Sequence, residues 1–145
     1  MTCVVITGST QGIGRGLAAE FCRRGCQVVI SGRDSQRLQA TAADLVANGG
    51  EVTAQGCDVA QVAQVQALWD HAVAQFGTVD IWINNAGLAR TVWPMLEVPQ
   101  DQVELMLSSN MLGTVNGCRV AARGMLQQGS GKLFNMLGGG SDGEY

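Results

Sequence analysis

An apolar strand that runs directly into a glycine-rich turn and then a helical pattern opens the chain and restricts its fold more than any other feature. Residues 4–6 form a β-branched run that is typical of a strand buried on both faces. Gly8, Gly12 and Gly14 follow it, and a helical pattern begins at Ile13. The backbone N–H groups and the positive end of such a helix point toward whatever lies over the turn, and the missing Cβ atoms leave room for a phosphate. The segment therefore predicts an anion-binding turn at the end of a buried strand.

Strand and helix patterns alternate along the rest of the chain. Apolar runs predict further strands over residues 27–31, 51–57, 79–84 and 132–136. Apolar residues at helical spacing predict helices from residue 13 to about 24, from Ser35 as the N-cap to 47, over 62–76, from about Pro99 onward, and over 110–128. This alternation predicts a single α/β domain over residues 1–145, with a doubly wound, Rossmann-like parallel sheet of about five strands.

Composition and charge exclude several classes of protein. The chain is 46% hydrophobic and 14% charged, which suits a compact domain with a buried sheet. Its net charge of -3 and its scattered arginines argue against a nucleic-acid-binding protein, which needs a basic surface. No apolar run approaches the ~20 residues of a membrane-spanning helix, so we expect no membrane span.

The cysteines and the beginning of the chain bear on its compartment. The five cysteines are widely spread and form no Cys-x-x-Cys pair, so we expect free thiols and no metal site. The chain begins directly with a strand, which leaves no room for a secretory leader. These observations predict the cytoplasm or another reducing compartment, such as a plastid stroma.

Four short motifs occur in the order and at the spacing of one known family. They are Thr-Gly-Ser-Thr-Gln-Gly-Ile-Gly at residues 7–14, Cys-Asp-Val at 57–59, Asn-Asn-Ala-Gly at 84–87 and Ser-Asn-Met-Leu-Gly at 109–113. Any one of them is weak evidence, but together they cover nearly the whole chain. The chain resembles the short-chain dehydrogenase/reductase family, which implies a nicotinamide-dependent oxidoreductase that acts on a small molecule with a carbonyl or hydroxyl group.

The resemblance implies a cofactor-binding role for residues at three strand ends, where ligands bind in folds of this class. The turn after the first strand would hold the pyrophosphate and a ribose, Asp58 and Val59 the adenine, and residues 85–87 the nicotinamide ribose. For Asp58 a helix N-cap is the alternative, because Gln61 follows three residues later. The predicted residues are Gly8, Gly12 and Gly14, the backbone of Ser9, Thr10 and Ile13, and Asp58, Val59, Asn85, Ala86 and Gly87.

The end of the second predicted strand bears on which nicotinamide cofactor is bound. NAD-binding sites place a carboxylate there for the ribose 2′-hydroxyl, but this chain has Gly32 and then Arg33. A guanidinium pairs with a 2′-phosphate, which a carboxylate would repel. The sequence therefore favours NADP(H) over NAD(H), with Arg33 in the site. A solvated turn arginine, partly neutralised by Asp34, is the alternative, and Gln11 supplies no second cation.

Two residues are candidates for a catalytic role. Asn110 resembles the asparagine that holds a water of the family's proton relay by bending a helix, and a helix N-cap is the alternative. The family's catalytic serine is absent, because Leu137 and Gly138 stand where two serines usually follow the fifth strand. Residues 134–141 instead resemble the chlorophyll b reductase branch, which makes Ser141 the candidate hydroxyl, with a flexible glycine-rich tail as the alternative.

The family's Tyr-x-x-x-Lys motif has no counterpart in this chain. The only tyrosine, Tyr145, lies too close to Ser141, and no lysine follows it. We therefore expect a chain that stops before the catalytic pair, from an NADP(H)-dependent oxidoreductase that transfers hydride between nicotinamide and a carbonyl or alcohol carbon. In the chlorophyll b reductase branch this carbon is a formyl group on a chlorin ring. A catalytically inactive dinucleotide-binding or interaction module is the alternative.

Small residues at a spacing of three or four occupy one face of the predicted helix over 110–128. They are Gly113, Gly117, Ala121 and Gly124. Such a face allows two helices to approach closely, so we expect it to contribute to a homo-oligomer of the full-length protein.

Overall fold

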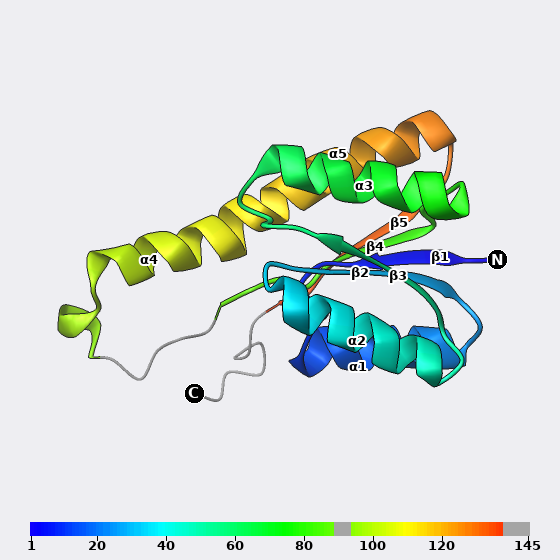
Figure 1. Cartoon of the computed structure of the whole chain (residues 1–145). Helices are drawn as coiled ribbons and strands as arrows, with labels where there is room; N and C mark the ends of the chain where they lie inside the picture. The colour runs from blue at the N-terminus through cyan, green and yellow to red at the C-terminus, as the bar shows by residue number, and fades with distance from the viewer. Residues whose placement is uncertain (89–93, 138–145) are drawn as a thin grey trace.

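The computed structural model describes residues 1–88 and 94–137, which form an open parallel sheet with helices on both faces (Figure 1). The elements are β1 (Cys3–Ile6), α1 (Gly12–Arg23), β2 (Gln27–Gly32), α2 (Ser35–Ala47), β3 (Glu51–Gly56), α3 (Val62–Phe76), β4 (Ile81–Asn84), a 3-10 turn (Met95–Glu97), α4 (Gln100–Leu107), a π-helical segment (Ser108–Leu112), α5 (Gly113–Gln128) and β5 (Lys132–Asn135). α1 and α2 cover one face of the sheet, α3 and α5 cover the other, and α4 projects beyond it (Figure 1). The predicted doubly wound α/β fold with five strands is confirmed.

The order of the strands creates a crevice at one edge of the sheet. The order is β3-β2-β1-β4-β5, so β1 lies at the centre and pairs with β2 on one side and β4 on the other. The chain builds outward from β1 to β3 and then crosses back to β4. The loops after β1 and β4 therefore leave the carboxyl edge in opposite directions, and sheets of this class bind ligands in the crevice between them.

Apolar side chains fill the space on both faces of the sheet. On one face, Val5 and the fully buried Trp82 pack against α3 and α5, and the ring centroid of Trp82 lies 6.1 Å from that of Trp69. On the other face, Val4 and Ile6 pack against α1 and α2. A strand that is buried on both sides needs a continuously apolar sequence, as β1 has. This two-sided core fixes β1 and thereby the turn at its carboxyl end.

The small residues of α5 face the interior of this chain, which corrects their predicted role in an oligomer interface. A Cβ atom at Gly117 would overlap Oδ1 of Asn84, and one at Gly124 would overlap the ring of Trp69. Ala121 is fully buried in the core. The absence of larger side chains lets α5 approach β4 and α3 closely, so this face is not available to a second copy.

Several element boundaries differ from the prediction. Asp34, not Ser35, caps α2, because its carboxylate accepts a hydrogen bond of 3.0 Å from the Arg37 N–H. β4 begins at Ile81 instead of Val79, and β3 and β5 each end before the predicted residue. The predicted helix over 110–128 belongs to one continuous helical stretch that starts at Gln100.

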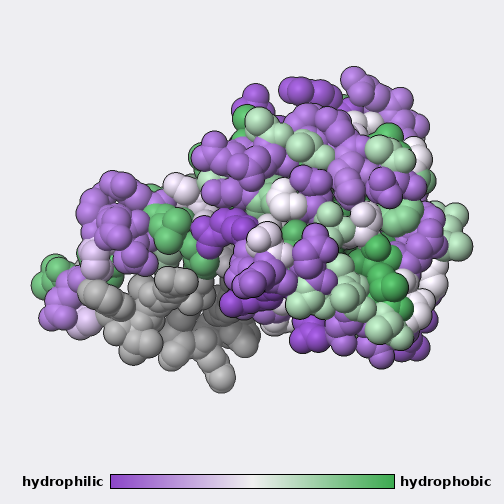
Figure 2. All heavy atoms as spheres, viewed as in Figure 1, coloured by the Kyte–Doolittle hydropathy of each residue, from purple (hydrophilic) through white to green (hydrophobic). Residues whose placement is uncertain are grey.

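The face of the molecule seen in Figure 2 is largely hydrophilic, with smaller hydrophobic areas that include a group on the projecting end around α4. Among the described residues, no helix combines the length and the apolar character that crossing a membrane requires.

Candidate functional site

A cleft of about 410 Å³ opens at the carboxyl edge of the sheet, where the order of the strands predicts a ligand site. It is lined by residues 8, 10–14, 32–34, 37, 57–59, 85–88 and 109. These residues come from the carboxyl ends of β1, β2, β3 and β4, from the first turns of α1 and α2, and from the π-helical segment. The cleft therefore gathers segments that lie far apart in the sequence.

Two glycines of the turn after β1 are required by close contacts with the loop after β4. Gly8 has a φ of 63°, and a Cβ atom there would lie 2.7 Å from the Cα atom of Ala86. A Cβ atom at Gly14 would overlap Nδ2 of Asn85 and lie 2.6 Å from the carbonyl oxygen of Gly8. Any larger residue at either position would push the two loops apart and deform the floor of the cleft.

The first turn of α1 presents backbone donors to the cleft. Gln11 is the N-cap and makes no side-chain capping bond. Within the described part of the chain, the N–H groups of Gly12, Ile13 and Gly14 have no acceptor, and all three residues line the cleft. Free N–H groups at a helix N-terminus, with no acidic side chain in the first turn, form a site for an anion.

Thr7 and Asn85 hold the glycine turn against the end of β4. The Thr7 Oγ1 atom accepts hydrogen bonds of 3.0 Å from the N–H groups of Asn85 and Ala86. In the other direction, Asn85 Nδ2 donates to the carbonyl oxygens of Thr7 and Gly8, each at 3.0 Å. The Asn85 amide therefore positions the turn, while residues 85–87 also line the cleft, where contact with a ribose is predicted.

Ser9 is the one residue of the predicted turn set that does not line the cleft. Its N–H donates to the carbonyl oxygen of Ser31 at 2.9 Å, and its Oγ donates to that of Ile6 at 2.8 Å. The Ser31 N–H in turn donates to Ser9 Oγ at 2.9 Å. Because these groups join β1 to β2 inside the fold, the Ser9 amide cannot bind a pyrophosphate, and its role is to fix the start of the turn.

Asp58 and Val59 line the cleft from the end of β3. The Asp58 carboxylate accepts a hydrogen bond of 3.0 Å from the Ala60 N–H and so closes a turn ahead of α3. The N-cap of α3 is Gln61, which excludes the alternative that Asp58 caps this helix. Burial, and the Asp58 charge beside it, raise the pKa of the Cys57 thiol to about 12, so this cleft-lining thiol stays protonated and is a poor nucleophile.

Two arginines reach the cleft at the end of β2. Arg33 is exposed and makes no ion pair with any described acidic residue, so its guanidinium is open to a ligand. Arg37, from the first turn of α2, donates a hydrogen bond to Gln11 Oε1 and lies 4.0 Å from the Asp34 carboxylate. The sequence reasoning missed this second cation. The sequence signal that could have indicated Arg37 is its position in the first turn of the helix that follows β2.

Asn110 lies in the π-helical segment, and the helix is continuous through it, so the N-cap alternative is wrong. Its Oδ1 accepts a hydrogen bond of 2.7 Å from the Leu88 N–H, and its Nδ2 donates to the Leu88 carbonyl oxygen at 2.9 Å. The side chain therefore holds the chain just after β4 with both its oxygen and its nitrogen. Asn110 itself does not line the cleft, but Ser109 beside it does; Ser109 opens the motif at 109–113, yet no role was predicted for it. Ser141, the other catalytic candidate, lies outside the described residues.

The cleft suits a nicotinamide dinucleotide in its shape and in its donors. The two required glycines leave room above the turn, the N–H groups of α1 suit a pyrophosphate, and the guanidinium groups suit a further phosphate. The family model of the short chain dehydrogenases matches residues 2–141 of the chain. The chain belongs to the short-chain dehydrogenase family.

Curated relatives of this short-chain dehydrogenase include chloroplastic reductases. The chain is 41% identical over 144 residues to chlorophyll(ide) b reductase NOL of Oryza sativa subsp. japonica, covering 97% of this chain and 42% of the rice protein. It is 35% identical over 158 residues to the probable chlorophyll(ide) b reductase NYC1 of Arabidopsis thaliana, covering 97% of this chain and 32% of that one. The chain thus spans less than half the length of these relatives.

Solved structures of the family have the same fold and were determined with either cofactor. A short-chain dehydrogenase/reductase from Burkholderia phymatum in complex with NAD is 34% identical, with a TM-score of 0.87 over 92% of this chain and 48% of that one. Actinorhodin polyketide ketoreductase with NADPH is 28% identical, with a TM-score of 0.89 over 97% of this chain and 54% of that one. The predicted family membership and fold are confirmed.

Proposed function

We propose that the chain forms the NADP(H)-binding part of an oxidoreductase that transfers hydride between nicotinamide and a carbonyl or alcohol carbon. The observation that carries the choice of cofactor is the pair of guanidinium groups, Arg33 and Arg37, at the end of β2. No carboxylate stands at Gly32, and a Cβ atom there would lie 2.8 Å from Thr10 Cγ2. Two cations and an absent carboxylate favour a ribose 2′-phosphate over a 2′-hydroxyl.

Each part of the cleft has its own role in this proposal. The first-turn N–H groups of α1 bind the pyrophosphate, and Asp58 and Val59 bind the adenine. The loop after β4, held by Asn85 and Asn110, positions the nicotinamide ribose. When bound, the nicotinamide supplies or accepts the hydride. We assign to Ser141 the hydroxyl that orients the substrate carbonyl.

The relatives support a substrate class for the whole protein. Two of them are named chlorophyll(ide) b reductases and are chloroplastic. We propose that the protein reduces a formyl group on a chlorin ring and works in a reducing compartment such as a plastid stroma. The free state of all five cysteines agrees with such a compartment.

An inactive nucleotide-binding module is the rival function, because the 145 residues contain no Tyr-x-x-x-Lys motif. A proton donor is needed for hydride transfer to a carbonyl, so the rival predicts NADPH binding without turnover. Mixing the chain with NADPH and a chlorin aldehyde and following absorbance at the nicotinamide band tests the rival. Steady oxidation of NADPH contradicts the rival.

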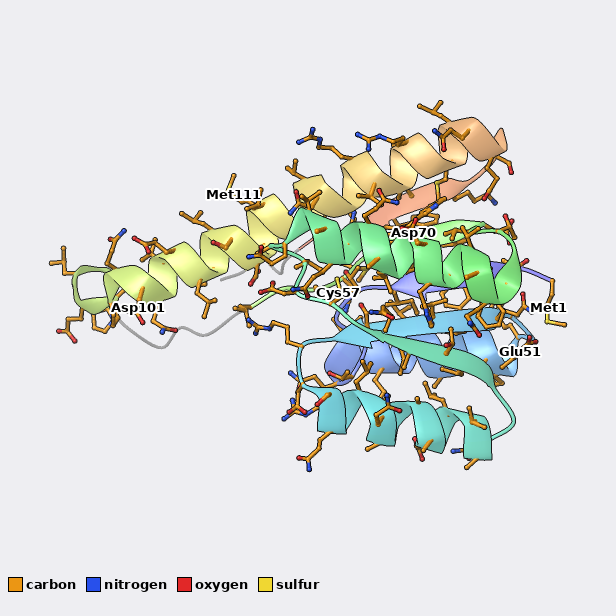
Figure 3. The ribbon with its side chains drawn as sticks, turned by 45° about the horizontal axis from the view of Figure 1, so that its top comes forward. Met1, Glu51, Cys57, Asp70, Asp101 and Met111 are labelled. Carbon is orange, nitrogen blue, oxygen red and sulfur yellow. The ribbon has the colours of Figure 1, made fainter. Side chains whose placement is uncertain are left out.

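We also propose that the full-length protein is a homo-oligomer, with α4 and the adjacent helix surface in the contact. Leu107, Met111 and Val115 are exposed at successive turns, and Met111 points away from the sheet in Figure 3. Light scattering on the wild type and on Met111→Glu tests this contact. A monomeric wild type contradicts it.

Separate titrations with NADPH and NADH, followed by nicotinamide fluorescence, test the choice of cofactor. We expect the wild type to bind NADPH at least about tenfold more tightly, and Arg33→Ala to bring the two affinities to within about threefold. Arg119→Ala removes an exposed arginine of α5 that does not line the cleft and is the matched control. Equal affinity of the wild type for both cofactors would overturn the proposal for NADP(H).

A further inference from the structure

Asn116 is a buried amide in α5 that lies outside the four family motifs. Its side chain is 4% exposed, and its Nδ2 atom donates a hydrogen bond of 2.9 Å to the carbonyl oxygen of Val59. This bond joins the long helix to the cleft-lining end of β3. Because its loss would leave a buried amide and a buried carbonyl without partners, the bond fixes the position of Val59 firmly.

Val59 is held by α5 at its side chain as well as at its carbonyl. A Cβ atom at Gly113, on the same helix, would overlap Cγ2 of Val59, so the backbone of α5 packs directly against this side chain. Val59 is 8% exposed. With its carbonyl oxygen and its side chain both held by the helix, Val59 has little freedom to move within the lining of the cleft.

The Val59 N–H is a free donor, and it lies next in the chain to the Asp58 carboxylate, one oxygen of which is bonded to the Ala60 N–H. Within residues 1–88 and 94–137, no atom accepts a hydrogen bond from it. The preceding residue, Asp58, lines the same cleft and presents a carboxylate. The base-pairing edge of adenine offers a ring nitrogen acceptor next to an amino donor, which complements an N–H and a carboxylate side by side. Hypoxanthine reverses this pattern, because it carries a ring N–H next to a carbonyl.

We propose that Asn116 is a positioning residue for adenine recognition, which fixes Val59 so that its N–H and the Asp58 carboxylate together select adenine over hypoxanthine. This inference rests on the proposed nucleotide-binding function. Asn116 itself touches no ligand, since it is buried beneath Val59 and does not line the cleft. Its effect therefore falls on the choice of base more than on the binding of the phosphates.

The test compares the affinities of the 145-residue chain for NADPH and for its hypoxanthine analogue, NHDPH. We expect the wild type to bind NADPH about tenfold more tightly than NHDPH, and Asn116→Leu, which removes the donor at similar volume, to reduce this ratio to about two. Gln128→Leu is the matched control, because Gln128 Nε2 donates to the backbone carbonyl of Val79 at 3.1 Å, at the opposite end of α5. We expect it to keep the tenfold ratio.

Each outcome bears on the inference separately from the proposed function. A wild type that binds neither nucleotide overturns both. A wild type that prefers NADPH, with an Asn116→Leu variant that keeps the same ratio, overturns the inference alone. So does a variant that loses affinity for both nucleotides equally, since that is the result of a purely structural role. If Asn116→Leu does not fold, Asn116→Ser, which is too short to reach Val59, is measured in its place with the same expected ratio.

Discussion

At the scale of single residues, the amide of Asn85 determines whether the glycine turn keeps its shape. Replacing it with alanine removes two hydrogen bonds of 3.0 Å to the turn backbone. We expect Asn85→Ala to lower the free energy of unfolding by about 2 kcal/mol and to weaken NADPH binding about tenfold. Urea unfolding and fluorescence titration measure the two effects.

Gln66→Ala is the control for Asn85→Ala, because Gln66 donates an exposed amide bond of 2.9 Å to Asp70 within α3, and neither residue lines the cleft. Its loss should change both quantities by little. An Asn85→Ala variant that binds NADPH as the wild type does would show that the turn keeps its shape without this amide.

The sequence predicted well those residues whose role follows from local geometry. Gly8 and Gly14 had to be small because a turn and a helix start there, and their contacts confirm it. The prediction gave Ser9 a role that its hydrogen bonds exclude, gave Asn85 only part of its role, and did not include Arg37 in the site. The hydrogen bonds of all three join segments from different strands and helices. A single sequence gives the pattern of a turn but not which partner its polar groups will find.

At the scale of elements, the fit of α5 against α3 depends on Gly124. A Cβ atom there would overlap the Trp69 ring, whereas one at Gly16 of α1 would meet open space. We therefore expect Gly124→Ala to lower the free energy of unfolding by about 1–3 kcal/mol. Gly16→Ala, the matched control, should raise it by about 0.5–1 kcal/mol, because alanine favours a helix. Urea unfolding of both variants measures these changes. A Gly124→Ala variant that is more stable than the wild type would contradict the close packing of α5 against Trp69.

The π-helical segment makes a second prediction at this scale. Asn110→Leu removes both bonds to Leu88, which lies at the end of the cleft predicted to hold the nicotinamide. We expect NADPH to bind about fivefold more weakly and 2′,5′-ADP, which lacks nicotinamide, to bind as before. Ser108→Ala is the control, since Ser108 bonds only within its own helix, to the Glu104 carbonyl oxygen at 2.7 Å. Equal losses for both nucleotides would show that Asn110 does not act at the nicotinamide end of the cleft.

The identities of the helices and strands were predictable, because their apolar residues recur at a regular spacing. The boundaries of the elements, and the continuity of the last helical stretch, were not predictable in this way. The stretch from Gln100 to Gln128 shows why. Asn110 looks like a helix cap in the sequence, yet the widened π turn carries the helix past it. Packing against Val59 stabilises Gly113 in the helix, and that contact is invisible in the local sequence.

At the scale of the whole molecule, one sheet carries two cores, and the cleft lies where the chain crosses from one half of the sheet to the other. Both walls of the cleft are anchored in both cores, because β1 and β4 each place side chains on both faces of the sheet. Loss of either core should therefore disturb nucleotide binding, which makes global stability and binding closely linked in this protein.

Because two thiols are buried, the free energy of unfolding depends on pH in the alkaline range. Burial, with a smaller effect of Asp80, raises the pKa of Cys3 to about 12, and burial with Asp58 does the same for Cys57. In the unfolded chain both thiols ionise near pH 9.0, so above that pH the unfolded state releases protons that the folded state keeps. Their stabilisation is complete below pH 9.0 and is lost as the pH rises toward 12.

We expect the free energy of unfolding to fall by about 3 kcal/mol between pH 8 and pH 10, about 1.4 kcal/mol for each thiol. Urea unfolding in the presence of a reductant at the two pH values measures the fall. Replacing Cys3 and Cys57 together with alanine should remove most of it, whereas Cys118→Ala, which keeps both buried thiols, should retain it. If the double variant falls as steeply as the wild type, groups other than these thiols control the alkaline stability.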